Sequence, residues 1–270
     1  MSESWYRIAL AGSAAPVVVV APGEHLGAAI DVAVRRVGKG VWPAAAALAE
    51  PGQVPLGESV GKGVVVEANP PAVPVGLRWP SGVIAAIGDA DQATQAVEGW
   101  IRRPADQLGV VEAQVGGDRL SELFFELVER LPTADNLEVK VLGHHDGAGT
   151  TEVWLTPHLD VRRAIRFLDD HDVELIDNGH VELSLYLRQE RSTLRLTEHK
   201  TIVWMSEEQA TVERFTGWLA ALKVPAAPEL VTLGDLDHYH YRPARSSPRG
   251  RLIERLKRMR LRKVDAYDAV

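Results

Sequence analysis

The strongest constraint on the fold is a series of alternating strands and amphipathic helices between residues 117 and 224. VELSLYLR (181–188) alternates apolar and polar residues, which is typical of a strand with one face in a core. DRLSELFFELVERL (118–131) repeats large apolar residues at three- and four-residue spacing, which predicts a helix with one buried face. The predicted order is helix, two strands, helix, three strands and helix, at 118–131, 136–143, 150–155, 160–171, 181–188, 192–197, 200–205 and 207–222. Segregated strands and helices of this kind predict an α+β fold, with a mostly antiparallel sheet and helices on one face.

The residues before this series predict a second small domain of α/β or α+β type. Strands are expected at 5–11, 17–21, 64–68 and 83–87, helices at 23–38 and 89–103, and loop-rich stretches at 39–62 and 69–82. A chain of 270 residues is long for one typical domain. We therefore expect two small domains, 1–105 and 106–224, followed by a linker and a basic C-terminal helix within 225–270.

The composition excludes several chemistries. The chain contains no cysteine, so it has no disulfide, no catalytic thiol and no cysteine-ligated zinc or iron–sulfur site. The apolar stretch 8–21 has no positive flank and is interrupted by Pro16, which favours two strands over a signal peptide. No stretch reaches the ~18 apolar residues of a membrane span. With its frequent Ala, Val, Arg and Leu, we expect a bacterial-like, cytoplasmic protein without a membrane span.

A glycine-rich segment resembles two catalytic patterns but fits neither. GESVG (57–61) matches the G-x-S-x-G pattern at Ser59, yet no strand-to-helix elbow surrounds it. GESVGKG is also one residue too short for a phosphate-binding loop and lacks the Ser or Thr that would bind Mg²⁺. We therefore assign no catalytic residue and no cofactor.

Histidines cluster in GHHDGAGT (143–150), the expected tip of a strand hairpin. His144, His145 and Asp146 lie together there, and His158 is expected at the same end of the hairpin. Histidine and aspartate at this density are candidate metal ligands or an acid–base pair. However, neighbouring residues of an extended segment point to opposite faces, so a solvated polar loop is the favoured interpretation.

A second histidine pair occurs in DLDHYHY (235–241). His238 and His240 are two residues apart and share one face of an extended chain, a spacing that suits chelation. The third ligand is left open among Asp235, Asp237, His199 and His171. The favoured interpretation is a terminal strand with Tyr239 and Tyr241 packed inward. Glu198 beside His199 is a conceivable catalytic dyad, but successive strand residues point apart, which disfavours it.

The C-terminal segment carries the strongest local charge signal. Residues 242–270 contain ten Lys or Arg and three acids, a net charge of +7, whereas the preceding residues carry −14. Ser247 followed by Pro248 predicts a helix start, and Leu252, Leu256 and Met259 share one face of the helix expected to run to 263. The candidate partner-binding residues are Arg249, Arg251, Arg255, Lys257, Arg258, Arg260, Arg262 and Lys263.

These features favour a non-enzymatic interaction, regulatory or assembly component that docks through its acidic body and basic helix. The partner is another protein or a second copy of the chain. One alternative is a metal-dependent enzyme that uses the histidine clusters. Another is a nucleic-acid-associated regulator, which the acidic body and the lack of an aromatic residue in the helix disfavour.

Overall fold

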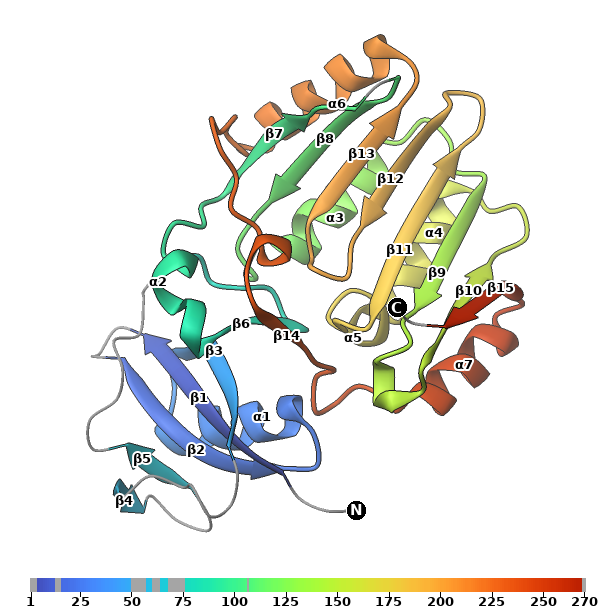
Figure 1. The fold of residues 1–270 in the computed structure, drawn as a ribbon. Helices are drawn as coiled ribbons and strands as arrows, with labels where there is room; N and C mark the ends of the chain where they lie inside the picture. Colours follow the sequence, from blue (N-terminus) through green and yellow to red (C-terminus); the bar gives the residue numbers. More distant parts are fainter. Residues whose placement is uncertain are drawn as a thin grey trace.

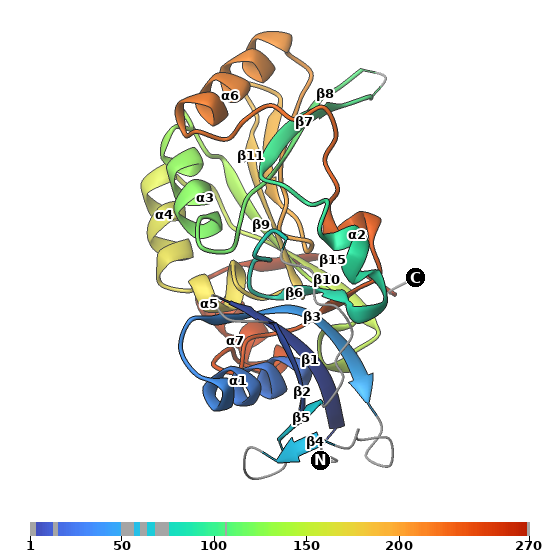
Figure 2. The ribbon, with the colours of Figure 1, turned by 90° about the vertical axis from the view of Figure 1, so that its left-hand side faces the viewer.

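Two β-sheets and their covering helices make up the fold, as the computed structural model shows (Figures 1 and 2). The structure describes residues 4–12, 16–49, 57–59, 64–67, 76–105 and 107–268. One sheet has seven strands in the order β14-β6-β3-β1-β2-β5-β4, and the other has eight in the order β15-β10-β9-β11-β12-β13-β8-β7. The predicted α+β class is confirmed.

The eight-stranded sheet is antiparallel throughout and carries its helices on one face (Figure 2). Its strands are β7 (Gly99–Arg103), β8 (Gly109–Gln114), β9 (Asn136–Val141), β10 (Thr150–Leu155), β11 (Val181–Leu187), β12 (Ser192–Leu196), β13 (Ile202–Ser206) and β15 (Arg262–Asp268). The helices are α3 (Leu120–Glu129), α4 (Val161–Asp169), α5 (Asp172–Leu175), α6 (Gln209–Ala221) and α7 (Arg249–Arg258). The alternating apolar residues of β11 and the apolar faces of these helices form one buried core, as their periodicity predicts.

The seven-stranded sheet packs against a single long helix, α1 (Leu26–Val37). Its strands are β1 (Ser4–Gly12), β2 (Val17–Gly23), β3 (Val41–Ala49), β4 (Gly57–Ser59), β5 (Val65–Glu67), β6 (Val83–Ala86) and β14 (His238–His240). Only β3 and β6 pair in parallel among the described strands. α2 (Ala90–Ala93) follows β6 after one short 3₁₀ turn (Ile87–Asp89).

Two predictions near the N-terminal sheet were wrong. The helix expected over 89–103 ends at Ala93, and residues 99–103 instead form β7, because their backbone pairs with β8 at the edge of the larger sheet. The stretch expected to be loop-rich from residue 39 contains β3, which pairs with β1 along nearly its whole length. In both places long-range strand pairing overrides the local sequence preference.

The C-terminal helix is shorter than predicted. α7 ends at Arg258, and Arg260 adopts a left-handed conformation with φ 65°. Arg260 N–H donates to the carbonyl of Lys257 (3.0 Å) and Leu261 N–H to that of Leu256 (3.0 Å), which is a Schellman ending. The chain then forms β15, so the candidate residues Arg262 and Lys263 lie in an edge strand paired with β10.

The segment 225–270 thereby contributes to both sheets. β14 joins the seven-stranded sheet through β6, and β15 joins the eight-stranded sheet through β10. Leu252 and Leu256 of α7 are buried in the core of the larger sheet, so the apolar stripe predicted for this helix packs on the protein's own body. Across the described ranges no helix combines the length and the apolar character needed to cross a bilayer.

Candidate metal centre

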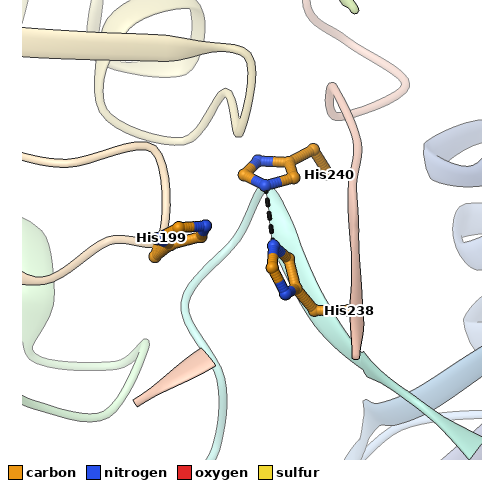
Figure 3. Close-up of side chains that lie close together, drawn as sticks. All are labelled: His199, His238 and His240. Atoms are coloured by element: carbon orange, nitrogen blue, oxygen red, sulfur yellow. Dashed lines mark hydrogen bonds between the residues drawn. The ribbon is translucent and has the colours of Figure 1, made fainter. Parts of the chain in front are cut away.

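Three histidines converge where the two sheets meet (Figure 3). His238 and His240 extend from β14 of the seven-stranded sheet, and His199 lies in the turn between β12 and β13 of the eight-stranded sheet. One ring nitrogen from each residue lies within 4.8 Å of the other two. All three residues are half-buried.

Close backbone contact holds β14 at this junction. Tyr241 N–H donates to the carbonyl of Gly82 (2.8 Å), and Gly179 N–H donates to the carbonyl of Tyr241 (3.0 Å). A Cβ atom on Gly179 would lie 1.8 Å from the Gly82 oxygen, so only glycine permits this approach. The position of β14 relative to the larger sheet is therefore fixed by these hydrogen bonds and by the absence of a side chain at Gly179.

The ring orientation of His238 and His240 is fixed by backbone carbonyls. His238 Nδ1 lies 2.7 Å from the oxygen of Leu236, and His240 Nδ1 lies 2.6 Å from the oxygen of Gly179. A carbonyl oxygen can only accept, so each Nδ1 carries a hydrogen. In the neutral rings both Nε2 atoms are therefore unprotonated, and these two atoms face each other 2.9 Å apart (Figure 3).

Burial keeps the rings of His240 and His199 neutral. It lowers the pKa of His240 to about 3, although the bond to Gly179 offsets part of the effect. Burial also lowers the pKa of His199 below its ordinary value, and the Glu198 carboxylate offsets part of that. Two facing lone pairs repel unless a proton or a metal ion lies between them, and the low pKa of His240 disfavours a proton on its Nε2.

The turn that carries His199 is anchored by a buried lysine. Lys200 is 1% exposed and has φ 64°, and its Nζ donates to the carbonyls of Asn178 (2.7 Å) and Val181 (3.3 Å). Burial lowers the pKa of Lys200 to about 7. With Lys200 pointing inward, His199 lies over β14, its ring centroid 4.7 Å from that of His238 and 5.2 Å from that of His240.

Three more histidines extend the cluster from His240. The ring centroid of His144 lies 4.7 Å from that of His240 and 4.8 Å from that of His180, and His145 lies 4.8 Å from His180. His144 is exposed and His145 is fully buried. Burial lowers the pKa of His145 to about 4 and that of His180 to about 2.

The hairpin histidines differ from expectation in two respects. His145 begins a short 3₁₀ turn (His145–Gly147) and His144 caps it, so the two do not form an extended segment and both rings contact His180. His158 does not join them. Since β10 runs antiparallel to β9, the residues after β10 lie near the start of β9, and His158 is exposed there, 3.9 Å from Asp135.

Of the possible third ligands, the structure brings His199 to the His238–His240 pair. His199 reaches the pair on β14, whereas His171 packs against Phe167 with ring centroids 5.6 Å apart. Asp235 instead closes a capping box with Thr232. Tyr241 is buried as expected for the terminal strand, and Tyr239 is half-buried. His180 was not singled out by the sequence, because it follows no recognisable ligand spacing.

The candidate residues of the basic segment divide into two groups. Arg249 is buried and donates to the carbonyls of Val141 (3.3 Å), Leu142 (2.7 Å) and Thr150 (2.7 Å). Arg255 pairs with Glu174, Lys263 with Glu152 (3.6 Å), and Lys257 lies 5.9 Å from the Trp154 ring centroid. The exposed remainder comprises Arg251, Arg258, Arg260 and Arg262.

Of the GESVG motif, Gly57–Ser59 form β4, while Val60 and Gly61 lie outside the described residues.

No protein-family model, curated protein or solved structure matches this chain. Its function is therefore inferred from its own geometry, in which the convergence of His199, His238 and His240 is the most specific feature.

Proposed function

We propose that this protein binds one divalent transition-metal ion, of the Zn²⁺ type, through Nε2 of His238, Nε2 of His240 and a ring nitrogen of His199. The observation that carries the proposal is the pair of Nδ1–carbonyl bonds, which turns two unprotonated nitrogens toward one point. Metal-bound histidines commonly donate their other N–H to a carbonyl in this way, which fixes the tautomer and raises ligand basicity.

The ligand chemistry supports the choice of metal. Neutral imidazole suits Zn²⁺, Cu²⁺, Ni²⁺ and Co²⁺, whereas Ca²⁺ and Mg²⁺ prefer oxygen ligands. With Zn–N bonds of about 2.0–2.1 Å, tetrahedral ligation separates two nitrogens by about 3.3 Å. The observed separation of 2.9 Å therefore needs only a small opening of the pair. Three protein ligands leave a fourth position for water, as in catalytic zinc sites.

Metal analysis of the purified, tag-free chain tests the proposal. We expect about one equivalent of bound metal after titration with Zn²⁺, measured by mass spectrometry and calorimetry. His240→Ala should weaken binding by at least tenfold because it removes one of three ligands. His158→Ala is the matched control, since His158 is exposed and lies beside Asp135. Substoichiometric binding, or equal binding by both variants, would contradict the proposal.

A second candidate function is docking of an anionic protein partner on the exposed residues Arg251, Arg258, Arg260 and Arg262 of the C-terminal segment. The supporting observation is that Arg251, Arg260 and Arg262 form no ion pair within the described part of the chain, and Arg258 is 3.8 Å from the exposed Glu254. Replacing all four with Glu should abolish partner capture and leave the circular dichroism spectrum unchanged. Retained capture of the same partners would exclude this surface.

A further inference from the structure

We propose that a cavity between α1 and the segment 241–245 binds a small molecule with an apolar body and one carboxylate or phosphate group. The cavity has a volume of about 370 Å³. This falls within the range of about 300–1,000 Å³ that is usual for small-molecule sites. It does not share His199, His238 or His240 with the candidate metal centre.

One side of the cavity is apolar. Ile30 and Val34 project from α1, and Pro43 projects from β3. Trp79 also lines the cavity; it is 7% exposed and belongs to a buried cluster. Such a surface favours a ligand with an aromatic or aliphatic body, because burying that body removes apolar area from water.

Two arginines give the cavity an excess of positive charge. Arg78 and Arg245 both line the cavity, and Asp31 is the only acidic residue among the described residues that line it. Asp31 already pairs with Arg35 at 2.5 Å. Arg78 forms no ion pair with any described residue, and its guanidinium carbon lies 5.9 Å from the Trp42 ring centroid. Arg245 pairs with Asp177 (2.8 Å) but its side chain stays 70% exposed.

The combination of an apolar lining and two arginines defines the ligand class. A guanidinium presents a planar set of donors that matches a carboxylate or phosphate. Two such groups beside an apolar wall select an anion that also carries an apolar body, and they disfavour a cation. α1 and the segment 241–245 approach each other closely beside the cavity, since a Cβ atom on Gly27 of α1 would lie 1.9 Å from the carbonyl oxygen of Arg242.

Two probes of the same shape and different charge test the assignment. Naphthalene-2-carboxylate and naphthalene-2-carboxamide are titrated into the full-length chain by calorimetry, with a chelator present. We expect one site, with the carboxylate bound at least tenfold more tightly, because only the carboxylate offers the arginines a charged acceptor. Arg78→Gln and Arg245→Gln should each reduce the carboxylate affinity and leave the carboxamide affinity unchanged.

Arg36→Gln is the control, because Arg36 is an exposed residue of α1 that does not line the cavity. The His240→Ala variant should bind both probes like the wild type, which separates this site from the metal centre. Equal affinity for the two probes, no saturable binding of either, or an equal loss in Arg36→Gln would overturn the proposal.

Discussion

The ring of His145 is fully buried, and its neighbours fix which nitrogen carries the hydrogen. Asn178 Oδ1 accepts from the backbone N–H of His180 (3.0 Å), so Asn178 Nδ2 faces His145 Nε2 (3.4 Å) and donates to it. The hydrogen of the neutral ring therefore lies on Nδ1. Protonating Nε2 would remove its bond to Asn178 and place a charge in the interior, which is why burial lowers the pKa of His145 to about 4.

This lowered pKa predicts a loss of stability in mild acid. Unfolded His145 takes up a proton near its ordinary pKa of about 6.5, but the folded protein does so only near 4. Between these values the unfolded state binds more protons, so the free energy of unfolding falls as the pH falls. His145 should account for about 2 kcal/mol of the loss at pH 5 and for almost none at pH 7.5 or above.

Urea unfolding at pH 7.5 and pH 5, with a chelator present, measures this effect. His145→Gln should lose less stability than the wild type between the two pH values. His158→Gln should lose as much as the wild type, because His158 is exposed. Identical losses in all three proteins would show that His145 does not cause the acid sensitivity.

At the scale of secondary structure, α7 is attached to the larger sheet by its first residue. Arg249 lies at the start of the helix, and its guanidinium satisfies three carbonyl groups near the ends of β9 and β10. Arg249→Met should lower the free energy of unfolding by about 3 kcal/mol, because buried carbonyls lose their donors. Arg251→Met, in the same helix but exposed, should change it by less than about 0.5 kcal/mol. Denaturant unfolding distinguishes these outcomes, and equal effects would contradict the role given to Arg249.

The sequence predicts elements well where the chemistry is local. The alternation of β11 and the periodicity of α3 follow from one buried face each, and both were predicted correctly. The strand β7 was missed because its pairing with β8, and the hydrogen bond from Ala227 N–H to the Trp100 carbonyl (2.9 Å), are not visible locally. The His238–His240 spacing was visible, but the choice of His199 over His171 depends on a turn in the other sheet.

At the scale of the whole molecule, two glycines set how closely the sheets approach. Gly179→Ala would place a Cβ atom 1.8 Å from the Gly82 oxygen, so the junction must open. We expect a loss of more than about 2 kcal/mol in unfolding free energy and at least tenfold weaker metal binding, because β14 would shift away from His199. Gly217→Ala in α6 is the control, since beyond the adjoining residues and the helix backbone no atom of the described residues lies within 4 Å of its Cβ position. It should be neutral or stabilising, and an equal loss in both variants would contradict this account of the junction.

The proposed metal ion would connect the two sheets at their junction. Its ligands come from β14 and from the β12–β13 turn, which are paired into different sheets. An ion that binds only the folded state slows every opening that separates its ligands. Amide hydrogen exchange should therefore slow in β6, in β14 and in residues 197–201 when Zn²⁺ is added, while β1 and β2 remain unchanged. The same experiment on His240→Ala should show no slowing. Uniform slowing across both sheets would instead indicate global stabilisation without a metal link at this junction.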